Sequence, residues 1–257
     1  MSATALLRKP LEQVESSLCL PTGRLGTAVG HVMSVQHRSL THWALRHLEP
    51  RSDADVLDVG CGSGMALRLV AQRNTTGRIA GVDLSPTMVA LTRRTNADVP
   101  AHRLDVRQGN AMALPFDDAS FDVVTATETL YFWPDAMRGL AECRRVLRPG
   151  GWLAVTLEMT RDAAERPTLL QRLFGRKFTD RSDAEGLHIL SGTELTAMVA
   201  ASGFSRVRFA VEPRRSLGWL CVMGQVPSSE PSLAAASSVT TTLTDNVTDN
   251  VTQENAR

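Results

Sequence analysis

Three glycines at alternate positions are the first residues whose spacing points to chemistry. Gly60, Gly62 and Gly64 follow the apolar run DVLDV at 55–59. A loop without Cβ atoms lets backbone N–H groups come close to a ligand. Asp83 ends the next apolar run, about 20 residues on, where a carboxylate can accept hydrogen bonds from both hydroxyls of a ribose. The glycine loop and the carboxylate together predict a site for a cofactor that contains adenosine.

The position of the third glycine separates two cofactor classes. The dinucleotide fingerprint G-x-G-x-x-G requires glycine at position 65, where this chain has Met65, and its third glycine comes one residue early. This mismatch disfavours an NAD(P)-dependent oxidoreductase, which is the main alternative among enzymes. A protein that holds an adenosine cofactor without catalysis would have the same loop.

A second group of chemically capable residues lies in ETLYFWPD at 128–135. Glu128 and Tyr131 come directly after the apolar run at 121–126, and polar groups at the end of such a strand can face a bound ligand. We therefore predict Glu128 and Tyr131 as candidate catalytic residues. Phe132 and Trp133 are expected to pack against the helix that follows.

Histidine and cysteine are sparse and scattered. His31 and His37 are typical of a helix surface, and the alternative is that one of them acts as a base or contacts the substrate. The cysteines show no Cys-x-x-Cys pair and no nearby histidine at ligand spacing, so we predict no metal site. Scattered thiols without a disulfide pattern are typical of a cytoplasmic protein. The cysteines stand at Cys19, Cys61, Cys143 and Cys221.

The elements that must position these residues alternate between short apolar runs and helical patterns. This alternation is typical of an α/β fold with a mostly parallel sheet and helices on both faces. We expect strands at 55–59, 78–83, 103–108, 121–126, 152–157, 204–211 and 217–224. We expect helices at 34–48, 64–73, 86–97, 134–147 and 193–202. The last two strands follow each other without a helix and therefore predict an antiparallel pair at one edge.

The flanking segments differ from this core. Residues 1–50 are expected to form an N-terminal helical cover, and 51–226 the cofactor-binding domain with an insert or lid at 159–190. The segment 227–257 is rich in Ser, Thr and Asn and lacks aromatic residues, so it predicts a disordered tail.

Charge and hydropathy exclude several classes of partner. The 28 basic and 27 acidic residues leave a net charge of +1, so no overall field attracts nucleic acid. No apolar run approaches the roughly 18 residues of a membrane span. We therefore expect a small-molecule partner, with no nucleic acid and no membrane; the sequence does not indicate the oligomeric state.

Four motifs occur in order over about residues 50–158: VLDVGCGSG, GVDLS, GNAMALPFDDASFDVV and RRVLRPGG. In these motifs the chain resembles the class I S-adenosylmethionine-dependent methyltransferases, and within them the small-molecule group related to ubiquinone and menaquinone biosynthesis. The resemblance implies a Rossmann-like seven-stranded sheet with an antiparallel last strand. It also implies S-adenosyl-L-methionine as the cofactor.

The resemblance implies a role for each residue of the cofactor site. Asp58 either serves the amino group of the methionine portion or orders the loop, and Asp83 binds the ribose. Asn110 stands where the family offers an acidic residue to adenine, and the backbone carbonyl of Thr127 meets the methionine amino group. The complete set of cofactor-binding residues is Asp58, Gly60, Cys61, Gly62, Gly64, Asp83, Leu84, Asn110, Ala111 and Thr127.

The predicted activity is transfer of the methyl group of S-adenosylmethionine to a small molecule, with release of S-adenosylhomocysteine. Its catalytic demands are modest, because the sulfonium is already a good leaving group and the protein mainly orients the reactants. A general base is needed only when the nucleophile arrives protonated.

Overall fold

The computed structural model describes residues 37–162, 189–215 and 218–228. Most of the predicted N-terminal cover at 1–50, of the predicted insert at 159–190 and of the predicted tail at 227–257 therefore lies outside the described residues, as do His31 and Cys19. Within the described ranges, no helix is long and apolar enough to cross a membrane.

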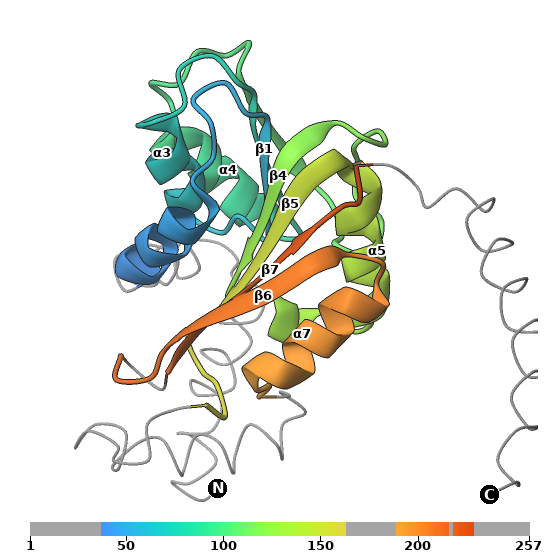
Figure 1. Cartoon of the computed structure of the whole chain (residues 1–257). Helices are drawn as coiled ribbons and strands as arrows, with labels where there is room; N and C mark the ends of the chain where they lie inside the picture. Colours follow the sequence, from blue (N-terminus) through green and yellow to red (C-terminus); the bar gives the residue numbers. More distant parts are fainter. Residues whose placement is uncertain (1–36, 163–188, 216–217, 229–257) are drawn as a thin grey trace, which may run out of the picture.

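A seven-stranded sheet forms the centre of the molecule, with strand order β3-β2-β1-β4-β5-β7-β6 (Figure 1). All strands are parallel except β7, which is antiparallel to both β5 and β6. This confirms the predicted topology, and it places the carboxyl ends of the first five strands at one edge. The strands are β1 Val56–Val59, β2 Ile79–Asp83, β3 Leu104–Gln108, β4 Phe121–Thr127, β5 Leu147–Leu157, β6 Ser205–Glu212 and β7 Trp219–Gln225.

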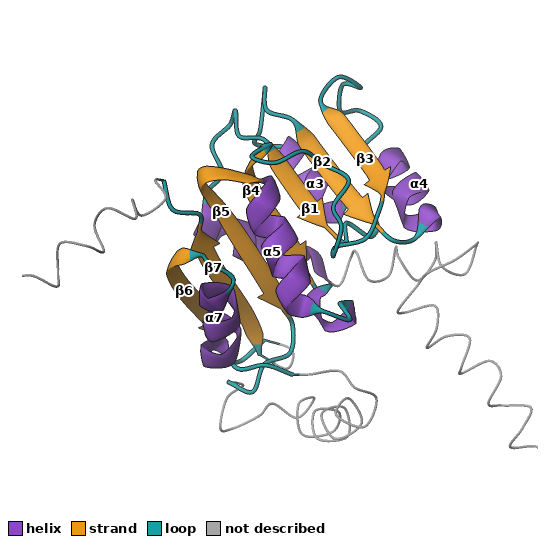
Figure 2. Cartoon of the chain, turned by 90° about the vertical axis from the view of Figure 1, so that its right-hand side faces the viewer, coloured by secondary structure: helices purple, strands orange, loops and turns teal. Residues whose placement is uncertain are grey.

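Helices cover both faces of the sheet (Figure 2). On one face lie α5 and α7, and on the other lie α3, α4 and an N-terminal helix over residues 37–48. A short 3₁₀ turn, η1, follows β4. These elements are α3 Met65–Ala71, α4 Pro86–Thr95, η1 Leu130–Phe132, α5 Ala136–Val146 and α7 Gly192–Ala201.

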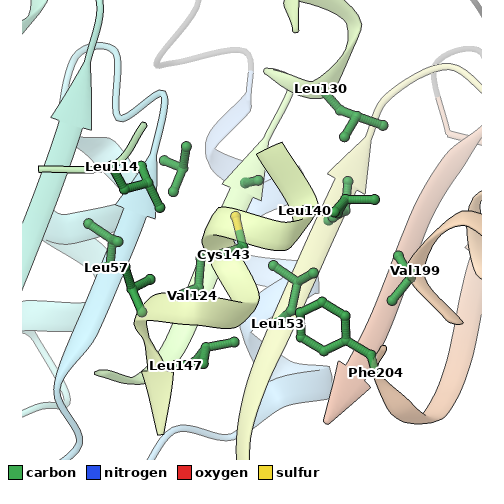
Figure 3. Packing of buried hydrophobic residues seen from close by; sticks show 14 of the residues in the cluster. Leu57, Leu114, Val124, Leu130, Leu140, Cys143, Leu147, Leu153, Val199 and Phe204 are labelled. Atoms are coloured by element: carbon green, nitrogen blue, oxygen red, sulfur yellow. The ribbon is translucent and has the colours of Figure 1, made fainter. Parts of the chain in front are cut away.

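The apolar core lies between the sheet and α5 and α7 (Figure 3). Leu140 and Cys143 of α5 are fully buried against Val124 and Leu153 of the sheet. A second cluster joins the N-terminal helix, α3 and α4 to the opposite face through Leu45, Leu67 and Val89. The two clusters hold β1 and β4 from both sides, so the loops at their carboxyl ends start from fixed positions.

Several predicted boundaries were wrong by a few residues. Pro134 does not lie in the first turn of α5, because Asp135 caps that helix by accepting a hydrogen bond from the backbone of Arg138 (3.0 Å) and the helix begins at Ala136. β5 begins at Leu147 rather than at 152, since the chain enters the strand through an irregular register opposite β4. α3 begins only after Gly64, whose left-handed backbone forms the helix cap.

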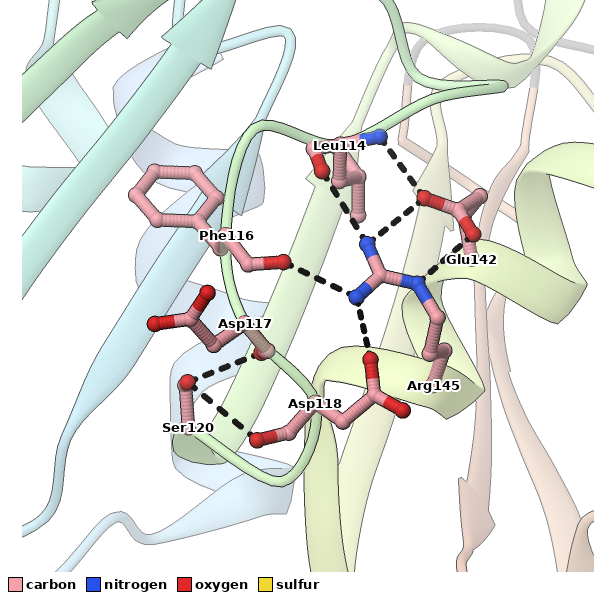
Figure 4. Close-up of polar contacts among 7 residues, drawn as sticks. All are labelled: Leu114, Phe116, Asp117, Asp118, Ser120, Glu142 and Arg145. Carbon is pink, nitrogen blue, oxygen red and sulfur yellow. Dashed lines mark hydrogen bonds and ion pairs between the residues drawn. The ribbon is translucent and has the colours of Figure 1, made fainter.

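Arg145 fixes the loop that leads from β3 to β4 (Figure 4). Its guanidinium forms ion pairs with Glu142 (2.8 Å) and Asp118 (2.6 Å). It also donates to the backbone carbonyls of Leu114 and Phe116. This clamp holds the loop whose first residues border the cavity described next.

Candidate active site

A cavity of about 290 Å³ opens at the carboxyl ends of the parallel strands. It lies where open α/β sheets bind their ligands. The predicted cofactor-site residues that line it are Asp58, Gly60, Cys61, Gly62, Asp83, Leu84, Asn110, Ala111 and Thr127. The structure thus brings together every predicted cofactor residue except Gly64. Gly64 caps α3 and is not among the residues that line the cavity.

The three loop glycines serve different purposes, although all have positive φ (73°, 51° and 82°). A Cβ on Gly60 would lie 2.2 Å from Oγ1 of Thr129, and one on Gly64 would lie 2.6 Å from Nδ2 of Asn96. A Cβ on Gly62 would meet no described atom nearer than the Gly60 carbonyl oxygen at 3.9 Å. Packing therefore requires two of the glycines, whereas the Cβ position of Gly62, which lines the cavity, is open.

Asp83 joins the glycine loop to the next strand end. One carboxylate oxygen accepts from the backbone N–H of Gly62 and the other from that of Ser85, both at 2.9 Å. Burial raises the pKa of Asp83, while these two backbone hydrogen bonds oppose the rise. Each carboxylate oxygen keeps a further lone pair for a ligand.

Asp58 is buried beneath the loop at the end of β1. Its Oδ1 accepts a hydrogen bond from the hydroxyl of Thr125 on β4 (2.6 Å). Burial raises the pKa of Asp58 to about 7, assisted by the charge of Asp83. Cys61 is also buried, with Sγ 3.5 Å from Oγ1 of Thr92, and burial raises the pKa of its thiol.

Apolar side chains also line the cavity near Asp83. Leu84 is 56% exposed, which leaves its side chain available to a flat ligand group. The side-chain oxygen of Asn110 accepts from the backbone N–H of Met112 (2.9 Å), so one of its lone pairs is already used within the loop. Ala111 packs against the main core and lines the same wall.

The opposite end of the cavity is titratable. Nε2 of His37 lies 3.1 Å from a carboxylate oxygen of Glu158. The carboxylate of Glu128 accepts a hydrogen bond from the backbone N–H of Glu158. One nitrogen or oxygen from each of His37, Glu128 and Glu158 lies within 4.8 Å of the others. The same three atoms are of a kind that can hold a divalent cation.

The protonation states at this end follow from burial and neighbouring charge. Burial raises the pKa of Glu128 to about 7, although the charge of His37 and the backbone hydrogen bond lower it. Burial alone would lower the pKa of His37, but its hydrogen bond to Glu158 and the charges of Glu128 and Glu158 raise it overall. His37 is therefore charged at lower pH, and Glu128 exchanges its proton near neutrality.

The aromatic residues of ETLYFWPD separate in the structure. The Tyr131 hydroxyl donates to the backbone carbonyl of Met159 (3.1 Å), and Tyr131 is not among the residues that line the cavity. Burial raises the pKa of Tyr131 well above its ordinary value. Trp133 packs against Gly139 of α5, as predicted, where a Cβ would lie 2.4 Å from the indole ring. The prediction for Phe132 was wrong, because its side chain is 41% exposed and lines the cavity.

Two residues of the titratable end were not predicted as such from the sequence: Glu158 was not identified, and His37 was expected on a helix surface. Glu158 directly follows β5, as Asp83 ends β2, so the same rule about strand ends identifies it. His37 is not a plain helix-surface residue, since it contacts Glu158 and lines the cavity. No local pattern indicates this contact, because 121 residues separate the two.

Comparison with known proteins agrees with the motifs. Residues 57–155 match a family described as a methyltransferase domain. The chain is 32% identical to the demethylmenaquinone methyltransferase of Lactiplantibacillus plantarum, in an alignment that covers 67% of this chain and 79% of that protein. For other curated relatives, such as the demethylmenaquinone methyltransferase of Listeria monocytogenes, the chain spans about half of their length (54%).

Solved structures share the fold. A chain of the complex between the Haloferax volcanii Trm112 methyltransferase activator and a methyltransferase aligns with a TM-score of 0.65 at 23% identity, covering 79% of this chain and 95% of that one. The [4+2]-cyclase SpnF aligns with a TM-score of 0.60 at 22% identity, covering 75% and 81%. Since one of these neighbours is a cyclase, this fold alone does not determine the reaction.

Proposed function

The chain belongs to the class I S-adenosylmethionine-dependent methyltransferases, whose cofactor is S-adenosylmethionine, and we propose that it methylates a small molecule held beside Glu128. The observation that carries this proposal is that the two ends of the cavity differ in their chemistry. One end combines the open space beside Gly62 with the carboxylate of Asp83, and the other presents the buried carboxyl of Glu128, with a pKa of about 7. A protein that only binds the cofactor does not require a titratable carboxyl at the second end.

The residues at the first end fit the cofactor. The free lone pairs of Asp83 suit two ribose hydroxyls, and the exposed side chain of Leu84 suits an apolar ring. Asp58, with its pKa of about 7, suits a cationic ammonium group, which would favour its ionised form. Gly62 leaves room for the ligand beside its backbone.

The residues at the second end suit an acceptor whose nucleophile carries a proton. The cofactor supplies a methyl group on a sulfonium, which needs no activation. Glu128 removes the proton from the acceptor, because a base with a pKa near the working pH combines ionisation with basicity. Protonated His37 places a positive charge beside Glu128 and thereby favours its carboxylate form, whereas the charge of Glu158 opposes this effect.

Calorimetry on the full chain tests the cofactor. S-adenosylhomocysteine is expected to bind with one site per chain, and NADH is not expected to bind. Binding of NADH in its place would instead support the oxidoreductase alternative and contradict the proposal.

Product masses test the reaction. The enzyme is incubated with S-adenosylmethionine and a panel of small phenols, enols, amines and thiols. Products are sought about 14 Da above each acceptor, because direct transfer replaces one hydrogen by a methyl group. Consumption of cofactor together with a methylated product supports the proposal. Cofactor binding without a product from any acceptor class favours a protein that binds the cofactor without catalysis.

We also propose a cytoplasmic location. Cys61, Cys143 and Cys221, the cysteines within the described ranges, are buried and free. Free thiols are typical of a reducing compartment. Fractionation of the native host would test this, and recovery in an oxidising compartment would contradict it.

A further inference from the structure

A second cavity, of about 630 Å³, lies beside the N-terminal helix. Its walls are that helix, the end of α3 with the residues after it, and the end of β6 with the start of β7. Its volume falls within the range of small-molecule sites, roughly 300–1,000 Å³. Its described lining residues are Arg38, Ser39, His42, Trp43, Leu45, Arg46, Leu69, Gln72, Arg73, Glu212, Arg215 and Trp219.

The lining is strongly basic, although the whole chain is nearly neutral. It contains four arginines, and Glu212 is its only described carboxylate. Within the described ranges, none of these four arginines forms an ion pair with a carboxylate. Six arginines elsewhere do, namely Arg51, Arg68, Arg107, Arg145, Arg148 and Arg161. The cavity therefore concentrates positive charge that the described chain does not neutralise.

The four arginines and His42 of this lining come from three elements. Arg38, His42 and Arg46 follow one another at four-residue spacing and so lie along one stripe of the N-terminal helix. Nη2 of Arg73, just after α3, lies 3.0 Å from Nε2 of His42. The guanidinium of Arg215 lies over the Trp219 ring, 5.6 Å from its centroid.

Two indole rings provide an apolar surface beside these charges. The ring centroids of Trp43 and Trp219 are 5.8 Å apart, with an interplanar angle of 51°. Trp43 is half-buried and Trp219 is 8% exposed. The exposed part of this pair, mainly Trp43, can contact the flat or apolar part of a ligand while the guanidinium groups hold its charged part. Guanidinium groups are suited to this task, because their planar donors match phosphate oxygens in pairs.

We propose that this cavity binds a phosphate-bearing ligand with more than one negative charge and an apolar portion that lies on Trp43 and Trp219. Because four guanidinium groups and only one described carboxylate line the cavity, it favours a ligand with two or three negative charges over one with a single carboxylate. The site is separate from the cofactor cavity, because His37 and Thr41 line that cavity while Arg38 and His42 line this one. One step along a helix turns a side chain by about 100°, so the N-terminal helix separates the two sites.

Calorimetry with inorganic pyrophosphate tests whether the cavity binds phosphate groups, whatever molecule carries them. The full chain is saturated with S-adenosylhomocysteine, so the cofactor cavity is filled, and pyrophosphate is titrated at low ionic strength. We expect one site per chain, and the double variant Arg38→Gln/Arg46→Gln should weaken binding at least tenfold, the order of magnitude for lost hydrogen bonds to a charged group. Added salt should also weaken binding.

A matched control removes the same charge elsewhere. Arg94→Gln/Arg206→Gln changes two exposed arginines that do not line the cavity, and binding should stay within about twofold of wild type. Where the first double variant does not fold, as judged by circular dichroism, the single change Arg73→Gln should reduce binding in its place. Equal losses in variant and control, or no binding of pyrophosphate and vesicles by the wild type, would overturn the proposal.

Sedimentation with vesicles distinguishes the source of the phosphate. Vesicles of phosphatidylglycerol and phosphatidylcholine are compared with vesicles of phosphatidylcholine alone. Binding to the anionic vesicles that depends on Arg38 and Arg46 assigns the phosphate to a lipid headgroup. Binding of pyrophosphate without binding to vesicles assigns it to a soluble metabolite.

Discussion

The two ends of the cofactor cavity are built in different ways. The end that holds the glycine loop comes mainly from two neighbouring strands, β1 and β2, and from residues within 58–84. Asn110 and Ala111, which follow β3, complete it. Backbone hydrogen bonds fix it, including those from Gly60 and Cys61 to the Val82 carbonyl (2.8 and 3.0 Å). The opposite end joins His37, Glu128 and Glu158 from three distant parts of the chain.

This difference in construction matches a difference in function, between binding a widely shared cofactor and recognising one particular acceptor. A loop set by backbone geometry tolerates many side-chain changes, so it suits a cofactor that many enzymes share. Side chains that meet across elements can be exchanged singly, so they suit the recognition of one acceptor. We therefore expect changes at the first end to alter cofactor affinity and changes at the second end to alter turnover.

Glu128→Gln should have the largest effect. It keeps an oxygen that can accept from the Glu158 backbone but removes the base, so kcat should fall by 10²–10⁴-fold, the usual contribution of a general base. Wild-type kcat should rise as the pH increases through about 7, because only the deprotonated carboxyl accepts a proton. The variant should lose this rise, while its affinity for S-adenosylhomocysteine stays unchanged.

Glu49→Gln is the control for this variant, since Glu49 is exposed and, like Glu128, has a positive φ (44° and 55°). A pH profile that persists in Glu128→Gln would assign the titration to another group. Asp58 also has a pKa of about 7, but its ionisation should change the affinity for the cofactor rather than kcat.

Gly62→Val should weaken cofactor binding by roughly a hundredfold, near the upper limit for overpacking. The added side chain points into the cavity, where a Cβ has no described neighbour within 3.9 Å. Gly150→Val is the matched control, because Gly150 also has positive φ (81°) and an open Cβ position but lies away from the cavity. Both variants should lose stability, and only Gly62→Val should lose binding in calorimetry; equal binding would mean that the loop is merely a turn.

Asp83→Asn should weaken binding of S-adenosylhomocysteine by roughly tenfold to a hundredfold. The amide keeps the size of the side chain but loses one acceptor oxygen, and unmade hydrogen bonds at buried groups cost about 1–3 kcal/mol. Calorimetry of the folded variant gives the measurement, with Asp117→Asn on the exposed loop as the control. Unchanged affinity would remove Asp83 from the ribose site.

Tyr131→Phe should have a small effect. It removes the hydroxyl that bonds the Met159 backbone but keeps the ring, so the free energy of unfolding should fall by about 1 kcal/mol. The kcat should change by less than a few-fold, as measured alongside a thermal melt. A fall in kcat comparable to that of Glu128→Gln would restore Tyr131 as a catalytic residue.

Removal of divalent cations with EDTA should have no effect on turnover. His37, Glu128 and Glu158 lie close enough to bind a metal, but the raised pKa of His37 favours its protonated ring beside Glu158. A metal requires the neutral imidazole. Loss of activity in EDTA, with recovery on adding one cation, would show that a metal occupies this end.

The sequence alone determined the architecture and the cofactor end. Alternation of apolar runs and helices predicted the parallel sheet with its antiparallel last strand, and the spacing of Gly60, Gly62 and Asp83 predicted the cofactor end. Such features are local, because strand periodicity and a strand-end loop depend on residues next to one another. The predicted start of α5 at Pro134 was wrong, because the side chain of Asp135 caps the helix and so decides where it begins.

Only the tertiary structure decided the titratable end of the cavity and the role of each glycine. The pairing of His37 with Glu158 depends on how the N-terminal helix packs on the sheet, across 121 residues of sequence. The same holds for Gly60 and Gly64, which are required by Thr129 and Asn96 rather than by a ligand. Contacts between distant elements depend on the packing of the whole core, and no local pattern encodes them.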